Sequence, residues 1–292
     1  MSAQASRREP DRPDPVVTDG DFAKFRDFFY RKTGIMFADN KRYFVDKRLH
    51  ERMLAAGQPL FRDYFNTLRF QASGDEFQAL VNLMTVNETY FYREEYQFRC
   101  LVRSILPEID RGKRPGEPVR IWSVPCSTGE EPYSIAFQLL DNWADVDRYD
   151  VEIVASDIDT TVLDQARAGI YGDRSVQHVP KPTLERFMRW RRGDYEVIAD
   201  IRDSIAFTRV NLSDPLSTRQ FRGFDVVFCR NLLIYFDDES RREAAQTIYE
   251  ALNPGGFVCL GHSESMSRIS SLFAIRKLPE AIVYQKPLSA EA

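Results

Sequence analysis

The most informative polar residues of this 292-residue chain follow short β-branched segments, at positions where a parallel sheet gathers its ligand-binding groups. The segment VRIWSV (119–124) runs into the turn PCSTGEEP and then into an amphipathic segment with Pro132 near its start. Ser127, Thr128 and Gly129 keep the side chains of this turn small. A ligand is therefore expected to approach the backbone closely, beside the free N–H groups of a helix N-terminus.

The same turn carries Glu130 and Glu131 but lacks the G-x-G-x-x-G pattern that brings a pyrophosphate against a helix. Two carboxylates repel a phosphate and attract a cation. S-adenosylmethionine carries a sulfonium and an ammonium, so the charge favours this cofactor over NAD and disfavours an NAD-dependent oxidoreductase. Interaction with the helix dipole is the alternative role of both glutamates.

Two further strand-forming segments end in polar residues. VEIVASD ends at Asp157, 28 positions after Gly129, near the spacing of about 20 residues at which an acid binds ribose hydroxyls. Asp159 is instead placed to cap the helix that follows. IAFTRVN ends at Asn211, beside Leu212, where an amide either reads the adenine edge or forms a turn.

CRNLLIYF places Arg230 and Asn231 at the end of another strand, on the same ligand edge, although an arginine there is otherwise a solvated surface group. The three histidines share no metal-binding spacing, and the four cysteines form no C-x-x-C pair. No metal site is expected, and the cysteines are expected to be reduced and mostly buried.

These residues require a mainly parallel sheet covered by helices, and the alternation of β-branched and helical segments is typical of an α/β fold. A helix at about 94–109 precedes the sheet. AIVYQK (281–286) is expected to pair antiparallel with the preceding strand. The five strands expected before it are VRIWSV, VEIVASD, IAFTRVN, FDVVFC and GFVCLGH.

The N-terminal region has a different pattern. Pro and charge dominate its first residues, and apolar residues then recur at helical steps, with Gly34 and Gly57 placed to end two helices. The expected organisation is a disordered tail (1–19), a small all-helical domain (20–86), a linker with a connecting helix (87–118), the α/β domain (119–287) with a small β insertion at about 169–204, and a tail (288–292).

Composition limits the partners and the location. The net charge of -4 gives no general attraction to nucleic acid. No apolar stretch approaches the roughly 18 residues of a membrane span, and the first residues lack the apolar run of a secretory signal. We expect a cytoplasmic protein without direct membrane insertion.

Six strings, taken together in their order and spacing, resemble the chemotaxis receptor methyltransferases, the CheR family. The strings are NETYFYRE (87–94), STGEEPYS (127–134), ASDID (155–159), VNL (210–212), CRNLLIYF (229–236) and GHSES (261–265). The resemblance implies a Class I (Rossmann-like) methyltransferase sheet that uses S-adenosylmethionine to convert glutamate side chains of chemoreceptors to methyl esters for sensory adaptation. It also implies cofactor contacts from Asn87, Thr89, Arg93, Glu131, Asp157, Asn211, Leu212, Arg230 and Asn231.

The alternative is a non-catalytic module that senses S-adenosylmethionine or acts as a signalling adaptor; the presence of Asn87, Arg93, Asp157 and Asn231 disfavours it. Methyl transfer to a carboxylate needs no general base, because an unperturbed glutamate with a pKa of about 4.3 is already ionised at neutral pH. The D/N-P-P-Y pattern of many amine methyltransferases is absent where CRNLLIY stands, which favours a carboxylate acceptor.

The substrate side is expected on the second helix, whose cations outnumber its acids and suit the acidic methylation helices of a chemoreceptor. A solvated charged face is the alternative. Either Arg48 or Arg52 is expected to position the accepting carboxylate. Some relatives grip a pentapeptide tether at the receptor C-terminus with the β insertion. Here WRRGDYEVIADIRDS lacks the glycine-rich loop associated with that use, so the tether is expected not to be required.

Overall fold

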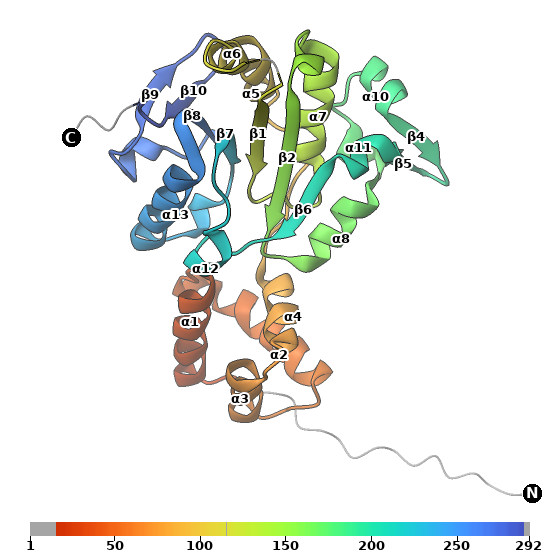
Figure 1. Ribbon diagram of the computed structural model, residues 1–292. Coiled ribbons are helices and arrows are strands. Elements are labelled where there is room, and N and C mark those ends of the chain that lie inside the picture. The colour runs from red at the N-terminus through yellow and green to blue at the C-terminus, as the bar shows by residue number, and fades with distance from the viewer. Residues whose placement is uncertain (1–15, 115, 289–292) are drawn as a thin grey trace, which may run out of the picture. The chain divides into compact units, whose positions relative to one another are not determined.

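The computed structural model describes residues 16–114 and 116–288, so most of the two expected tails lies outside the described residues. The chain forms two compact units (Figure 1). Of the described residues, one unit contains 16–31 together with Phe37–Met84, and the other contains Lys32–Met36, 85–114 and 116–288. The short segment Lys32–Met36, which comprises the last two residues of the first helix and the start of the loop after it, therefore belongs to the larger unit.

The smaller unit is all-helical. Phe25, Phe29 and Leu49 are fully buried in its core. Gly34 and Gly57 take positive φ just beyond the ends of the first two helices, as predicted from the sequence. Its elements are α1 (Asp19–Thr33), the 3₁₀ turn η1 (Asp39–Lys41), α2 (Arg42–Ala55), α3 (Phe61–Phe70) and α4 (Asp75–Met84).

The larger unit contains a seven-stranded sheet in the order β6-β2-β1-β7-β8-β10-β9. The first five strands of this order run parallel, while β10 is antiparallel to both of its neighbours. The predicted pairing of 281–286 with the preceding strand is confirmed by the register of Tyr284 with Val258. The strands are β1 (Pro118–Ser123), β2 (Asp150–Asp157), β6 (Ile205–Arg209), β7 (Phe224–Cys229), β8 (Leu252–Leu260), β9 (Ala274–Lys277) and β10 (Ile282–Gln285).

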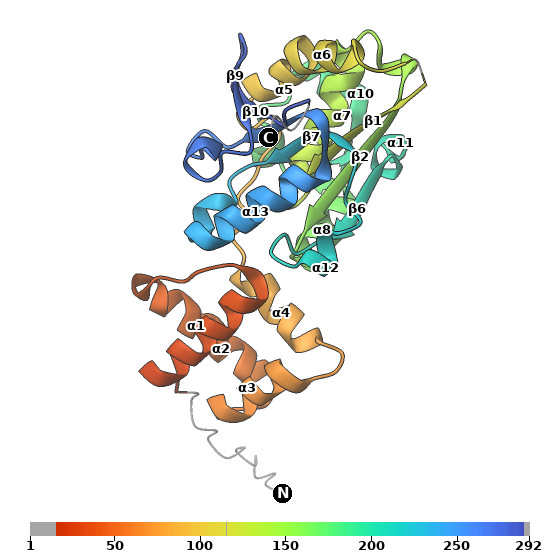
Figure 2. The same ribbon diagram turned by 60° about the vertical axis from the view of Figure 1, so that its left-hand side comes forward.

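Helices cover both faces of this sheet, with α13 on one side and α7 on the other (Figure 2). Neighbouring residues of a strand alternate between the two cores: Ile121 packs on the α7 side and Trp122 on the α13 side. All four cysteines are buried and free, as expected. No described helix is long and apolar enough to cross a membrane. The main helices are α7 (Glu130–Asn142), α8 (Thr160–Ala168), α12 (Pro215–Thr218) and α13 (Asp238–Ala251).

The connecting helix differs from the single helix predicted at 94–109. Tyr92 and Glu94 both have φ of 58°, so the helix begins only after them. It continues as α5 (Tyr96–Cys100), a π-helical turn η2 (Leu101–Ile105) and α6 (Leu106–Asp110). Positive φ at two non-glycine residues is unusual and is often found beside functional sites.

The predicted β insertion is confirmed as a three-stranded sheet in the order β3-β5-β4. A turn at Arg192 and Gly193 joins its two longer strands. The elements of the insertion are β3 (Ile170–Tyr171), α9 (Asp173–Val176), α10 (Lys181–Phe187), β4 (Met188–Arg191), β5 (Asp194–Val197) and α11 (Ala199–Asp203).

Candidate cofactor and substrate site

The turn after β1 is as tight as its small residues predicted. Gly129 has φ of 95°, and a Cβ at this position would lie 2.9 Å from both the Ala166 Cβ and the Tyr171 hydroxyl. The hydroxyl of Tyr171, on β3 of the insertion, donates to the carbonyl of Thr128 at 2.7 Å. The position therefore requires glycine. The insertion supports the turn through the hydrogen bond from Tyr171.

Asp157 organises this turn from the end of β2. Its carboxylate accepts hydrogen bonds from the backbone N–H of Ser127 at 2.8 Å and of Asp159 at 3.0 Å. The residue is 3% exposed, and burial raises the pKa of its carboxyl to about 6 despite these two donors. Asp157 thus holds the backbone of the turn in place as well as ending a strand on the expected ligand edge.

Asp159 caps α8, which was its predicted role, by accepting from the backbone N–H of Thr161 at 2.8 Å. Its second oxygen accepts from Asn87 Nδ2 at 2.8 Å and from the Thr85 hydroxyl at 2.7 Å. The carbonyl of Asn87 in turn accepts from the Ser127 hydroxyl at 3.2 Å. The segment that begins NETYFYRE is thereby fixed beside the glycine turn.

The two neighbouring glutamates of the turn have different surroundings. Glu130 is buried, and its carboxylate accepts hydrogen bonds from the hydroxyls of Thr128 at 2.6 Å and Ser175 at 2.7 Å. Burial raises the pKa of Glu130. The expectation that both glutamates face a cationic ligand is wrong for Glu130, because its oxygens are satisfied by groups of the turn and the insertion.

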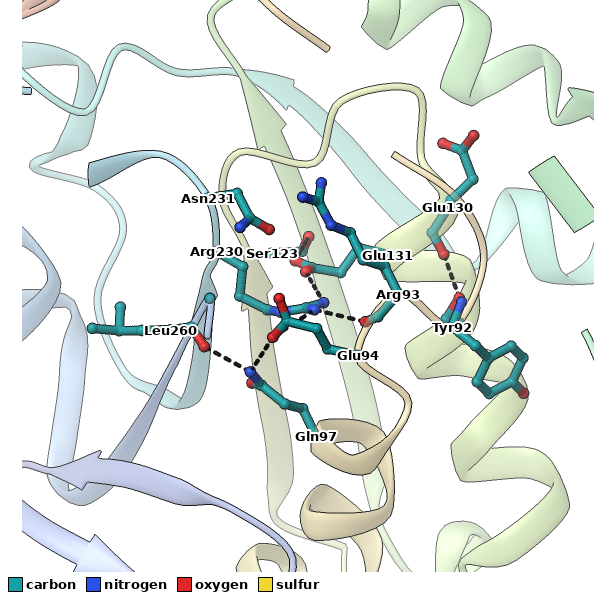
Figure 3. Close-up of polar contacts among 12 residues, drawn as sticks. Tyr92, Arg93, Glu94, Gln97, Ser123, Glu130, Glu131, Arg230, Asn231 and Leu260 are labelled. Carbon is teal, nitrogen blue, oxygen red and sulfur yellow. Dashed lines mark hydrogen bonds and ion pairs between the residues drawn. The ribbon is translucent and has the colours of Figure 1, made fainter. Parts of the chain in front are cut away.

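Glu131 joins a buried ionic group centred on Arg230 (Figure 3). The Arg230 side chain is 3% exposed and lies between Glu131, at 2.9 Å, and Glu94, at 3.3 Å. It also donates to the carbonyl of Arg93 at 2.6 Å. Burial opposes the charge of the guanidinium, but the two carboxylates outweigh this effect and raise the pKa of Arg230. The alternative of a solvated arginine is therefore wrong.

Glu94 was not chosen from the sequence, although it ends the string NETYFYRE. His262 Nδ1 lies 2.8 Å from one of its oxygens, and Gln97 Nε2 donates to the other at 2.9 Å. Burial disfavours ionisation of Glu94, but the contacts with His262 and Arg230 prevail and lower its pKa to about 2. We name Glu94, Glu131 and Arg230 the ionic triad; it contains two carboxylates and one guanidinium.

Two predicted cofactor residues keep polar groups available beside this triad. Arg93 donates from Nη1 to the carbonyl of Glu88 at 2.7 Å and its guanidinium lies over the Tyr90 ring, outside the triad. Within the described residues, the half-buried hydroxyl of Thr89 has no hydrogen-bond partner. Both groups therefore remain open to a ligand without disrupting the ionic triad.

Asn231 follows Arg230 with φ of 59°, and a carboxylate holds this conformation in place. The backbone N–H groups of Asn231, Leu233 and Gly261 donate to Glu264 at 2.8, 2.7 and 2.9 Å. Glu264 belongs to the string GHSES, but nothing in its local sequence indicated a role. It links the segments after β7 and β8, and burial raises its pKa.

Asn211 makes the turn that was its alternative role. Its Oδ1 accepts from the backbone N–H of Ser213 at 3.1 Å, and its Nδ2 donates to the carbonyl of Lys32 at 2.7 Å. Leu212 beside it is buried. Both ends of the Asn211 amide are thus engaged in contacts within the protein.

Arg48 and Arg52 make internal contacts in the helical unit. Arg52 forms a paired contact with Glu76, at 3.0 Å from Nε and 2.6 Å from Nη2, and the Tyr64 hydroxyl donates to the same carboxylate. Arg48 donates to the carbonyl of Leu83 at 2.5 Å, and its guanidinium lies 3.3 Å from the centroid of the Phe44 ring. Each arginine therefore helps to hold this unit together.

The remaining predicted residues converge on one edge of the larger unit. The glycine turn with Glu131, Asp157, Arg230 and the Asn231 turn lie at the carboxyl ends of neighbouring parallel strands, and Glu94 reaches Arg230 from the segment before α5. The ionic triad has one carboxylate more than it has guanidinium groups. Small residues, open polar groups and this excess of carboxylate fit a ligand that is cationic at one end, as S-adenosylmethionine is.

Comparisons with known proteins agree with this geometry. Residues 87–282 match the family model "CheR methyltransferase, SAM binding domain", and residues 20–85 match "CheR methyltransferase, all-alpha domain". The chain is 54% identical over 273 residues to "Chemotaxis protein methyltransferase 2" of Vibrio cholerae, covering 93% of this chain and 94% of the relative. It is 35% identical over 266 residues to "Chemotaxis protein methyltransferase" of Escherichia coli, covering 89% and 90% of the two chains. The chain therefore belongs to the CheR methyltransferase family.

Proposed function

We propose that this protein transfers a methyl group from S-adenosylmethionine to glutamate carboxylates of chemoreceptors in the cytoplasm, giving glutamate methyl esters and S-adenosylhomocysteine. The observation that supports this proposal best is the buried ionic triad beside the glycine turn, in a chain of the CheR methyltransferase family. A site with an excess of carboxylate suits the cationic cofactor. Intact polar groups along the strand ends disfavour a purely adaptor role.

We propose a role for each strand end in holding the cofactor. Asp157 suits the ribose hydroxyls, and the backbone of the Asn211–Leu212 turn suits the adenine edge. Arg93 and Thr89 suit the carboxylate of the methionine part, because they supply a cation and a hydroxyl. Asn87, Glu131, Arg230 and Asn231 complete the site, with Arg230 acting through the carboxylates it holds.

The chemistry requires little from the protein beyond position. When bound, S-adenosylmethionine supplies an electrophilic methyl group. The accepting glutamate is ionised at neutral pH, so the protein does not need to remove a proton. Its contribution is to align the carboxylate with the methyl group and to exclude water. The rigid turns held by Asp157 and Glu264 serve that alignment.

The helical unit supplies the proposed receptor-binding surface. Lys41, directly before α2, and Lys47, within α2, are exposed and are available to acidic methylation helices. Either Arg48 or Arg52 remains the proposed ligand of the accepting carboxylate. Because Arg52 is paired with Glu76, direct contact with a substrate requires it to exchange one carboxylate for another.

We also propose that a receptor pentapeptide tether is not required. The longer strands of the insertion are joined by the short turn at Arg192 and Gly193, without a glycine-rich loop. Binding of a receptor tail pentapeptide by calorimetry tests this point, and micromolar affinity contradicts it.

The main experiment is transfer of radiolabelled methyl from S-adenosylmethionine to chemoreceptor cytoplasmic domains, followed by mild base. Base-labile label that disappears when receptor glutamates are replaced by alanine supports carboxyl methylation. Cofactor binding without any transfer supports the adaptor role instead.

A further inference from the structure

A cavity of about 380 Å³ lies beside the strand-end site, and none of the roles described above uses it. Its walls come from the segment after β7, the first turns of α13 and the loop after β8. Glu264 also lines it, so the carboxylate that holds the Asn231 turn is shared between that turn and this cavity. The residues that matter for its chemistry are Leu233, Ile234, Arg241, Arg242, Arg268 and Ile269.

Three guanidinium groups line the cavity, and they differ in what they contact. Arg241 is anchored, because its Nε donates to the carbonyl of Leu233 at 2.9 Å and its Nη1 pairs with Asp238 at 3.1 Å. Arg242 and Arg268 are exposed, and neither has an ion-pair or hydrogen-bond partner for its side chain within residues 16–114 and 116–288. Arg242 and Arg268 are thus available to a partner, whereas Arg241 is held in the wall of the cavity by its own contacts.

The acids of the cavity do not neutralise these two cations. The Glu264 carboxylate accepts hydrogen bonds from backbone N–H groups in the loop after β8, to which it belongs, and in the segment after β7. Asp238 is paired with Arg241. The cavity therefore offers unpaired positive charge over an apolar wall of Leu233, Ile234 and Ile269.

Both chain connectivity and hydrogen bonding link this cavity to the Asn231 turn. Leu233 and Ile234 follow Asn231 within three residues, and Leu233 donates its backbone N–H to the same carboxylate as Asn231. A group bound in the cavity would rest on the turn that ends β7. A protein segment carrying the accepting glutamate would extend over this edge, with its other side chains beside it.

We propose that this cavity binds acidic side chains of the receptor segment that flanks the accepting glutamate, with Arg242 and Arg268 as the paired cations. The proposal rests on the proposed function, since the substrate there is a glutamate-bearing protein segment. Glutamate side chains match both features of the cavity, because their carboxylates suit the guanidinium groups and their methylene stems suit the apolar wall. In this proposal the cavity selects which receptor segment is methylated and does not contribute to cofactor binding.

The test compares methylation kinetics of the full-length protein with those of a double variant, Arg242→Glu with Arg268→Glu. We expect KM for the receptor domain to rise by about tenfold or more, because like charges then face each other. Cofactor affinity measured by calorimetry and the kcat at saturating receptor should stay within about twofold, as expected for a rim charge that acts on the substrate alone. The matched control is Arg111→Glu, an exposed arginine beyond α6 that should leave KM unchanged.

Charge exchange identifies the partner. Acidic receptor residues within a few turns of the accepting glutamate are replaced by lysine one at a time, and at least one such receptor should lower the KM of the double variant while raising that of the wild type. An unchanged receptor KM for the double variant overturns the proposal while the proposed function stands. A raised KM that no receptor lysine restores also overturns it. If the wild type transfers no methyl group to any receptor domain, the proposed function fails first.

Discussion

The Glu264 carboxylate accepts a hydrogen bond from the backbone N–H of Asn231 at 2.8 Å, although 33 residues separate them in the chain. Asn231 has φ of 59°, a conformation that a non-glycine residue rarely adopts without support. A Cβ on Gly261 would lie 2.7 Å from Asn231 Nδ2, so the loop after β8 packs closely on this turn. The geometry of the β7 end is therefore set by the loop that follows β8.

Glu264→Gln should destabilise the protein and lower its methyl-transfer rate. Both carboxylate oxygens of Glu264 accept hydrogen bonds from backbone N–H groups. In the glutamine variant an NH₂ group replaces one of these oxygens and faces at least one backbone N–H donor. An unsatisfied buried donor costs about 1–3 kcal/mol, which urea unfolding resolves. Glu243→Gln, at an exposed position of α13, is the control and should unfold like the wild type. Equal stability of the two variants would show that Glu264 does not hold the turn.

The adjacent residues Glu130 and Glu131 provide a matched pair. Glu131→Gln removes a charge from the ionic triad and should weaken cofactor binding by about tenfold, the effect of roughly 1.4 kcal/mol. Glu130→Gln keeps one acceptor oxygen, and its NH₂ group can donate to the second hydroxyl, so the contacts with Thr128 and Ser175 survive and cofactor affinity should stay close to that of the wild type. Calorimetric titration with S-adenosylhomocysteine measures both. A larger loss from Glu130→Gln would reverse the assignment.

Most of the fold could be predicted because the alternation of β-branched with helical segments and the glycines that end helices are both visible in short stretches of sequence. Strand β9 was not predicted, since its four residues include Arg276 and Lys277 and show no apolar run. The π-helical turn at Leu101–Ile105 also leaves no mark in the apolar spacing of the sequence. The helix predicted at about 94–109 is present and uninterrupted from Tyr96 to Asp110, but it begins two residues later because Glu94 has a positive φ.

The candidate site was predicted less completely than the fold, and the reason is sequence distance. Arg230 pairs with Glu131, 99 positions away, and donates to the carbonyl of Arg93, 137 positions away. No local pattern tells a buried arginine in such a group from a solvated one. The same holds for Glu130 and Glu131, which are adjacent in sequence but face different partners because consecutive helix residues point in different directions.

The raised pKa of Asp157 should make the free energy of unfolding depend on pH. Burial raises its pKa to about 6 in the folded protein, whereas an unfolded Asp titrates near a pKa of about 3.9. Between these values the folded state binds the proton and the unfolded state does not, so the contribution of Asp157 to stability increases as pH falls from about 6 to 4. The difference in unfolding free energy between wild type and Asp157→Asn should change in that direction. A difference that stays constant with pH would contradict the raised pKa.

Replacing Arg52 should impair receptor methylation, either because Arg52 contacts the accepting carboxylate or because its ion pair with Glu76 stabilises the helical unit. Arg52→Ala leaves the Glu76 carboxylate, 11% exposed, with the Tyr64 hydroxyl but without its cation, and should reduce both the stability and the methylation rate. Adding Glu76→Gln removes the uncompensated charge and should restore much of the stability. If Arg52 contacts the accepting carboxylate, receptor methylation stays impaired in this restored double variant while cofactor affinity matches the wild type. If methylation recovers together with stability, the role of Arg52 is to hold α2 against α4, and the exposed Lys41 and Lys47 become the cations to test by charge reversal.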